Sequence, residues 1–147
     1  GKRGVLVVGV DSLLTQLAKC CRPAPPDLIS GFVTRGRGVS IHRCDCKSFR
    51  ELAKREPERV IDVAWGDTRD AVYPVDIVVL ANDRHGLLRD ISEVFARQRI
   101  NVIGVNTQSR QAIARMVFTA EVGNGDHLAR ALAGIREVPG VLEADRR

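Results

Sequence analysis

The fold is decided by the stretch Val75-Asp76-Ile77-Val78-Val79-Leu80-Ala81-Asn82-Asp83-Arg84-His85-Gly86-Leu87-Leu88. Residues 75–81 are mostly β-branched or aliphatic, and this composition predicts a strand. The polar residues 82–86 then predict a turn, after which apolar residues return at the helical period of 3.6. The apolar stripe of this helix comprises Leu87, Leu88, Ile91, Val94 and Phe95.

A second half with the same kind of pattern follows. Residues 100–108 and 113–122 predict two strands joined by a turn at Arg110-Gln111. The second of these strands places five apolar side chains on one face: Ala114, Met116, Phe118, Ala120 and Val122. Residues 123–126 begin another helix, with Asp126 as the expected N-cap and a core stripe of Leu128, Leu132 and Ile135. Pro139-Gly140 ends this helix before a last strand at residues 141–144.

The order β-α-β-β-α-β is typical of a ferredoxin-like unit, in which an antiparallel sheet carries both helices on one face. The opposite face of such a sheet has no helix to cover it. We therefore expect self-association, as a homodimer through this sheet.

The residues before this unit predict a smaller module. Polar residues 66–70, followed by Tyr73-Pro74, mark a joint, so that we expect one domain at 1–70 and a second at 74–147. The first should contain an opening strand at 5–10, a hairpin of strands 28–34 and 39–42, a helix at 47–55 and a closing strand at 60–65. The predicted fold class is therefore α+β: a small cysteine-rich β-hairpin and helix module followed by a ferredoxin-like βαββαβ domain.

The composition favours a folded protein with an acidic partner. No stretch of the 147 residues approaches the roughly 18 to 20 apolar residues of a membrane span, and the start lacks the apolar region of a signal peptide. We therefore expect a cytoplasmic protein without membrane contact. The net charge of +5 is concentrated in the first module, where 13 Lys and Arg up to Tyr73 stand against 9 Asp and Glu. Such a surplus favours RNA as a partner, although solubility alone can account for it.

All four cysteines lie within 27 residues, in the clusters Cys20-Cys21 and His42-Arg43-Cys44-Asp45-Cys46. In a reducing compartment, thiols bind metal or carry out redox chemistry more often than they form disulfides. The alternative is that they are buried as small apolar groups. Neighbouring residues of an extended chain point to opposite faces, so Cys20 and Cys21 can share one ion only if the chain turns there.

These motifs together resemble a known family. Residues 18–23, 31–39 and 42–46 resemble the cysteine-rich module of the long RelA/SpoT-type enzymes, which are the ribosome-associated GTP pyrophosphokinases and (p)ppGpp hydrolases of bacteria. Residues 83–91 resemble the start of an ACT domain, which follows that module in the family. The resemblance implies a regulatory C-terminal region whose synthetase and hydrolase domains lie upstream. We therefore expect no catalytic residues and no enzyme activity in this chain.

The resemblance also implies sites in the cysteine-rich module. It implies a zinc-finger-like centre with zinc as the cofactor and with Cys20, Cys21, His42 and Cys46 as ligands. Cys44 departs from the family pattern and is an alternative ligand. It further implies binding to ribosomal RNA and tRNA on the ribosome, and the cations that suit this role are Arg35, Arg37, Arg43 and Lys47. The alternative is a solvated hairpin.

ACT domains commonly bind amino acids where the first strand meets the first helix. The matching positions are Asn82, Asp83, Arg84, His85 and Gly86, with Asn101, Val102 and Ile103 opposite. The alternative is that Asp83 caps the helix and Arg84 is solvated. The resemblance thus implies control of the family's own catalytic domains in the stringent response, either through ribosome binding or through sensing of branched-chain amino acids.

Overall fold

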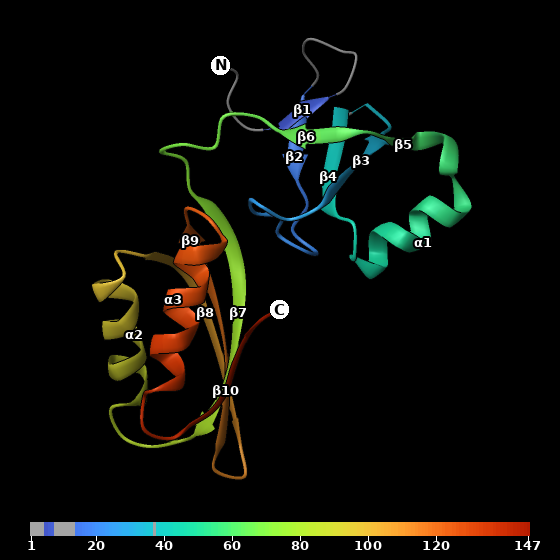
Figure 1. The fold of residues 1–147 in the computed structure, drawn as a ribbon. Helices are drawn as coiled ribbons and strands as arrows, with labels where there is room; N and C mark the ends of the chain where they lie inside the picture. The colour runs from blue at the N-terminus through green and yellow to red at the C-terminus, as the bar shows by residue number, and fades with distance from the viewer. Residues whose placement is uncertain (1–4, 8–13, 37) are drawn as a thin grey trace. The chain divides into compact units, whose positions relative to one another are not determined.

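The computed structural model describes residues 5–7, 14–36 and 38–147, which fold into two compact units, Gly1–Ala71 and Val72–Arg147 (Figure 1). The mixture of strands and helices confirms the predicted α+β fold class. Among the described residues, the structure contains no helix that is both long and apolar enough to cross a bilayer.

The first unit is built on a sheet of four short strands in the order β2-β4-β3-β5 (Figure 1). Its strands are β2 (Thr15–Leu17), β3 (Ile29–Thr34), β4 (Gly38–Arg43) and β5 (Val60–Ile61). The predicted hairpin is confirmed as the antiparallel pair β3 and β4, whereas β2, which was not predicted, runs parallel to β4. Helix α1 (Lys47–Arg55) begins and ends at the predicted residues and leads into a 3₁₀ turn, η1 (Pro57–Arg59).

The single strand predicted at residues 60–65 is wrong, because the chain changes sheets at Asp62. Strand β5 pairs with β3, whereas β6 (Val63–Trp65) pairs with β1 (Val5–Val7) in a separate two-stranded sheet. Because β5 and β6 pair with different strands, the chain must bend between them, and the apolar composition of residues 60–65 does not indicate this bend. Of the opening strand predicted at 5–10, the structure shows residues 5–7, and residues 8–10 lie outside its described part.

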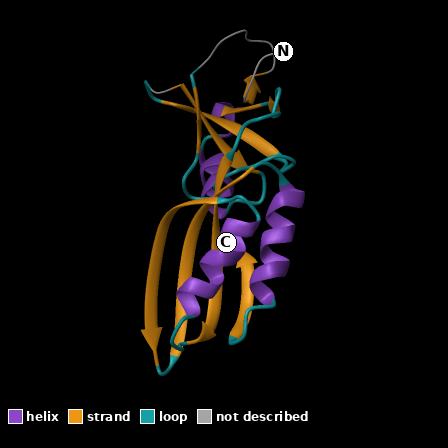
Figure 2. Cartoon of the chain, turned by 90° about the vertical axis from the view of Figure 1, so that its left-hand side faces the viewer, coloured by secondary structure: helices purple, strands orange, loops and turns teal. Residues whose placement is uncertain are grey.

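The second unit has the predicted β-α-β-β-α-β order. Its elements are β7 (Tyr73–Asn82), α2 (Leu87–Arg97), β8 (Asn101–Arg110), β9 (Ile113–Val122), α3 (Gly125–Arg136) and β10 (Val141–Arg146). The four strands form one antiparallel sheet in the order β10-β7-β9-β8, and both helices cover the same face of it (Figures 1 and 2). The core lies between the sheet and the helices, where the predicted apolar face of β9 is buried. In this core the rings of Phe118 and Phe95 pack with their centroids 5.1 Å apart.

Three local predictions in this unit need correction. Leu88 lies at the margin of the apolar stripe of α2 and is 49% exposed. Asp126 is not an N-cap: α3 begins one residue before it, and the side chain of Asn124 accepts the N–H of His127 at 2.9 Å. The turn between β8 and β9 falls on Gln111 and Ala112, which both have positive φ.

The close approach of α2 and α3 depends on Gly134, since an added Cβ there would lie 2.7 Å from Cγ1 of the buried Val94. Gly134→Ala gains about 1 kcal/mol of helix propensity but forces an overpacked contact that costs about 1 to 3 kcal/mol. We expect a net loss of about 1 kcal/mol in the free energy of unfolding, measured by urea denaturation. Val94→Ala in the same chain should relieve the contact, so strictly additive effects in the double variant would contradict this account.

Candidate functional site

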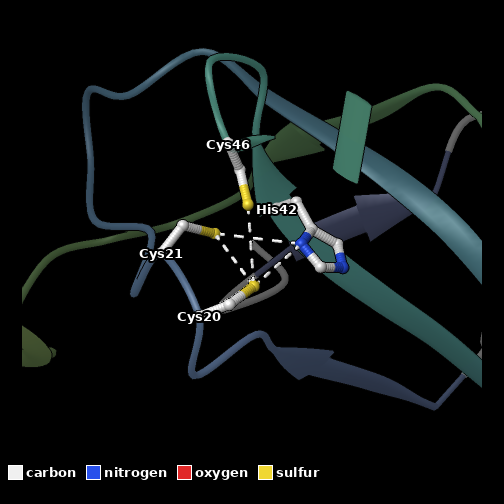
Figure 3. Close-up of side chains that lie close together, drawn as sticks. All are labelled: Cys20, Cys21, His42 and Cys46. Atoms are coloured by element: carbon white, nitrogen blue, oxygen red, sulfur yellow. Dashed lines mark hydrogen bonds between the residues drawn. The ribbon is translucent and has the colours of Figure 1, made fainter. Parts of the chain in front are cut away.

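The structure brings together the four residues predicted as metal ligands. The ligand atoms of Cys20, Cys21, His42 and Cys46 all lie within 4.8 Å of one another (Figure 3). Cys20 and Cys21 lie in the turn after β2, His42 is on β4, and Cys46 is the N-cap residue of α1. The cluster therefore joins three segments that are separate in the fold of the first unit.

The adjacent cysteines share one centre because the chain turns at this point. The N–H of Arg22 donates to the carbonyl oxygen of Ala18 at 3.0 Å, and Arg22 itself has a φ of 43°. This tight turn brings both sulfurs to the same side, 4.0 Å apart. The turn that two adjacent cysteines need in order to share one ion is therefore present.

The spacing of the donor atoms is close to that of tetrahedral coordination, although the widest pairs are up to 4.8 Å apart. The sulfur of Cys20 lies 3.6 Å from that of Cys46 and 3.4 Å from Nδ1 of His42, and the sulfur of Cys21 lies 3.9 Å from the same nitrogen. A tetrahedral zinc ion with bonds of about 2.0 to 2.3 Å requires donor separations of about 3.4 to 3.8 Å. Three thiols and one imidazole could therefore hold a metal ion of this kind.

Neighbouring groups hold the imidazole in place for Nδ1 to act as a ligand. Ser40, two residues earlier on β4, places its hydroxyl 2.9 Å from Nε2 of His42. The ring of Phe49 stacks on the imidazole at 5.5 Å with an interplanar angle of 28°. Partners of this kind fix the orientation of a histidine ligand, and the contacts of Ser40 and Phe49 with His42 were not predicted from the sequence. For Ser40, the one indication in the sequence was the alternation of a strand, which places residues 40 and 42 on the same side.

Local environment sets the protonation of the four ligands. Burial raises the pKa of the Cys21 thiol to about 12, and it also raises the pKa of Cys20. Burial acts in the same direction on Cys46, but the nearby backbone N–H groups of Phe49 and Ser48 favour its thiolate and lower its pKa, although neither makes a full capping hydrogen bond. Burial lowers the pKa of His42, which keeps the ring in the neutral form that binds metals.

Cys44, the alternative ligand, lies outside the donor cluster that the structure shows among its described residues. Strand β4 ends at Arg43, and the turn that follows leaves the Cys44 thiol exposed. Cys44 lines a shallow hollow of about 300 Å³ together with Asp27, Arg43 and Arg50. The backbone turn, which a strand-like spacing of 42, 44 and 46 does not reveal, separates this cysteine from the other three.

The predicted RNA-binding cations lie on the hairpin and at its exit. Arg35 is exposed and pairs with Glu56 at 3.4 Å, and Arg43 pairs with Asp45 at 2.8 Å. Arg37 lies outside the described residues, and Lys47 is the exposed first residue of α1. The two hairpin arginines that the structure describes therefore already have carboxylate partners.

In the second unit, a hollow of about 410 Å³ lies where β7 meets α2. Four of the predicted ligand-binding residues line it: Asp83, Arg84, His85 and Gly86. The rest of its lining comes from α2, from the second half of β8 and from the first half of β9: Leu87, Leu88, Arg89, Thr107, Ala114 and Met116.

The predicted partners Asn101, Val102 and Ile103 do not line this hollow, and neither does Asn82. Strands β7 and β8 lie on either side of β9 and both run antiparallel to it, so the end of β7 and the end of β8 are at the same end of the sheet. The start of β8 is at the opposite end of the sheet, where Asn101 donates to Glu121 at 2.8 Å. The register of the sheet thus corrects this part of the prediction.

Arg84 holds the loop around this hollow together. Its guanidinium donates to the carbonyl oxygens of Pro139 and His85, at 2.8 and 3.0 Å, and pairs with Asp90 at 2.8 Å. The hydrogen bond from Arg84 lowers the pKa of the Asp90 carboxyl. Asp83 does not cap α2, because the N-cap position is occupied by Gly86 with a φ of 80° and no side-chain cap.

Two family models match the chain in tandem. The RelA/SpoT RIS domain matches residues 5–66, and the ACT domain matches residues 69–146. The first match lies within the first unit, and the second covers nearly all of the second unit.

Bacterial relatives extend across both matches. The GTP pyrophosphokinases of Escherichia coli and Streptomyces coelicolor are each 44% identical over 144 residues, which are 97% of this chain and 19% and 17% of those proteins. The bifunctional (p)ppGpp synthase/hydrolase RelA of Mycobacterium tuberculosis is 43% identical over 144 residues, 97% of this chain and 19% of that protein. The chain thus spans less than a fifth of the length of these relatives. It belongs to the ACT domain family, and the residues ahead of its ACT domain match the RelA/SpoT RIS domain.

Proposed function

We propose that this chain is the regulatory C-terminal region of a bacterial stringent-response enzyme that makes or hydrolyses (p)ppGpp. The observation that supports this most directly is the 44% identity to a GTP pyrophosphokinase over 144 residues, which include both units. Since the chain covers only 19% of that relative, the proposal assigns pyrophosphate transfer and hydrolysis to other parts of the longer protein. This region would then control the reaction without catalysing it, in the cytoplasm.

The proposed cofactor of the first unit is zinc, bound by Cys20, Cys21, His42 and Cys46. Three thiolates and one imidazole are a common ligand set of structural zinc, and a closed set of four protein ligands leaves no open position for a substrate. His42 and Cys46 are 6% and 8% exposed, so the ion would lie at the edge of the small core around Phe32 and Phe49. Zinc would thus stabilise the fold of this unit.

Zinc content and proton release test this assignment. Chain purified without chelator should contain about one zinc ion by elemental analysis, and Cys46→Ser should remove it while Cys44→Ser retains it. Because Cys20 and Cys21 have raised pKa values, they carry protons at neutral pH that the metal must displace. Calorimetry in buffers of different ionisation enthalpy should therefore show release of about two to three protons per ion. A zinc-free chain, or loss of zinc in Cys44→Ser, would contradict the assignment.

The proposed partner of the first unit is ribosomal RNA, with uncharged tRNA on the same ribosome. The basic residues Arg35, Arg37, Arg43 and Lys47 support this assignment, since guanidinium groups donate in pairs to phosphate oxygens. Regulation requires that the region bind differently in two states of the enzyme. On the ribosome it would relieve inhibition of synthesis, and in free enzyme it would favour another state.

Replacing Arg35, Arg37 and Arg43 together by Ala should weaken association with purified ribosomes in a co-sedimentation assay. The loss of phosphate contacts should also flatten the dependence of binding on salt concentration. The matched control replaces three exposed arginines of the second unit, Arg97, Arg110 and Arg130, by Ala and removes the same charge. Equal binding of the hairpin variant and the wild-type chain would exclude a role for the hairpin.

A homodimer through the open face of the ACT sheet is also part of the proposal. Strands β7 and β9 present half-buried apolar side chains on the face away from the helices, among them Val78, Leu80 and Val117. A second copy could cover this surface and so complete the burial of the sheet.

The second candidate function is amino-acid sensing, which the hollow at the start of α2 favours. Gly86 provides no side-chain cap for α2. The N–H of Leu87 donates to the carbonyl oxygen of Arg84 at 3.3 Å, so the next N–H groups of the first turn are the candidate donors for a carboxylate. Leu87, Ala114 and Met116 supply an apolar wall that suits an aliphatic side chain.

Calorimetry with valine and isoleucine tests this candidate. The wild-type chain should give a heat of binding, and Leu88→Glu should abolish it by placing a charge beside the apolar wall. Leu88 is already half exposed, so its replacement should leave the fold intact. If neither amino acid binds to the wild-type chain, the hollow serves only as a contact surface.

A further inference from the structure

Helix α1 presents three cations along its solvent-facing side. Lys47, Arg50 and Lys54 are spaced at i, i+3 and i+7, which places them on one face, and all three are exposed. The opposite face packs Phe49, Leu52 and Ala53 against the small core. Seven residues of helix span about 10 Å, so these side chains form a ridge of positive charge of that length.

The exposed Glu51 shares this face of α1, but no ion pair joins it to Lys47 or Lys54 among the described residues, so the face keeps a positive excess. Neither Lys47 nor Lys54 has a carboxylate within ion-pair distance among the residues that the structure describes. Arg50 uses only its Nε–H, which donates to the carbonyl oxygen of Cys44 at 3.2 Å. By contrast, Arg35 and Arg43 of the hairpin pair with Glu56 and Asp45. Among the hairpin and helix residues that the structure describes, the cations without a carboxylate partner therefore lie on α1.

Two of these cations, Lys47 and Arg50, lie where they do not stabilise the helix, whereas Lys54 lies in the last turn, where positive charge is favourable. The N-terminal end of a helix favours negative side chains, because its unpaired N–H groups carry partial positive charge. The first turn of α1 contains no acidic residue, and Lys47 and Arg50 stand at its first and fourth positions. A local arrangement that opposes helix stability is expected where the side chains have a function outside the helix.

The ridge is also held in a fixed place relative to the donor cluster. Cys46 immediately precedes α1, and Phe49 stacks on the ring of His42, so two of the four candidate ligands contact or adjoin the helix. An ordered row of charges binds a regular array of opposite charges better than flexible side chains do, because less conformational freedom is lost on binding.

We infer that Lys47, Arg50 and Lys54 form the main contact surface of this unit for the phosphate backbone of double-stranded RNA, a surface that rests on the RNA-binding function proposed above. Three cations over about 10 Å match the spacing of a few successive phosphates. The unit offers no row of aromatic side chains for base stacking among its described residues, since Phe32 and Phe49 are buried and Trp65 is half-buried, with its indole N–H donating to the carbonyl oxygen of Asp27. The contact therefore reads the shape and charge of a duplex and not its sequence.

The test compares four chains: wild type, Lys47→Ala/Arg50→Ala/Lys54→Ala, the hairpin variant Arg35→Ala/Arg37→Ala/Arg43→Ala, and the control Arg97→Ala/Arg110→Ala/Arg130→Ala. Binding to purified ribosomes and to a short RNA duplex is measured between about 50 and 200 mM salt. The ridge variant should lose roughly tenfold or more in affinity, and its slope of log affinity against log salt should fall by about 2 to 3. The hairpin variant should lose less, and the control should match the wild type.

Two outcomes overturn this assignment and differ in what they say of the proposed function. If the wild-type chain binds and the ridge variant binds equally well, the ridge is not the contact surface, whereas the RNA-binding function stands. If the wild-type chain binds neither ribosomes nor duplex, both fail together. Lys47→Ala/Lys54→Ala keeps the bond from Arg50 to Cys44, so it separates lost contacts from a disturbed turn. Circular dichroism and zinc content verify that each variant is folded.

Discussion

The first unit depends on the turn of residues 18–22, because this turn alone allows two adjacent thiols to face a histidine and a third thiol from other segments. The unit has short strands and a small cluster of buried apolar side chains around Phe32 and Phe49. Domains of this size bury too little apolar surface to be robust and often rely on metals or other cross-links. Loss of the turn would separate β2 from β4 and α1 at the point where the donors meet.

The second unit is stabilised by its apolar core and does not depend on a cluster of donor side chains like that of the first unit. Alternate residues of β7 and β9 are buried against α2 and α3, and the helices approach so closely that a Cβ at residue 134 would overlap the side chain of Val94. One chain therefore combines a unit held by local donor geometry with a unit held by a continuous apolar core. Conditions that remove a metal or oxidise thiols should act on the first of these and spare the second.

The periodicity of apolar residues made much of this architecture predictable from the sequence. The features that depend on pairing between distant strands could not be predicted in this way. The bounds of α1 and β9 follow from apolar spacing and flanking turns, and the donor set of Cys20, Cys21, His42 and Cys46 follows from residue chemistry and from the family resemblance. The break at Asp62 and the position of Asn101 depend on which strand lies beside which, and this information is not local. The exclusion of Cys44 and the contact of Ser40 with His42 likewise depend on where a strand ends and which way it faces.

The sheet of β1 and β6 has a mechanical consequence. Its register pairs Val5, the first residue of β1, with Trp65, the last residue of β6. The chain therefore enters β1 and leaves β6 at the same end of the two-stranded sheet. A force that pulls these ends apart opens the backbone hydrogen bonds one after another, as in a zipper, and does not load them all at once in shear. Such a pair yields at low force. Tension between the N-terminal side of Val5 and the chain after Trp65 is therefore borne first by β1 and β6. Only after β1 has been peeled away does the load reach β2 and β5 of the sheet that carries His42.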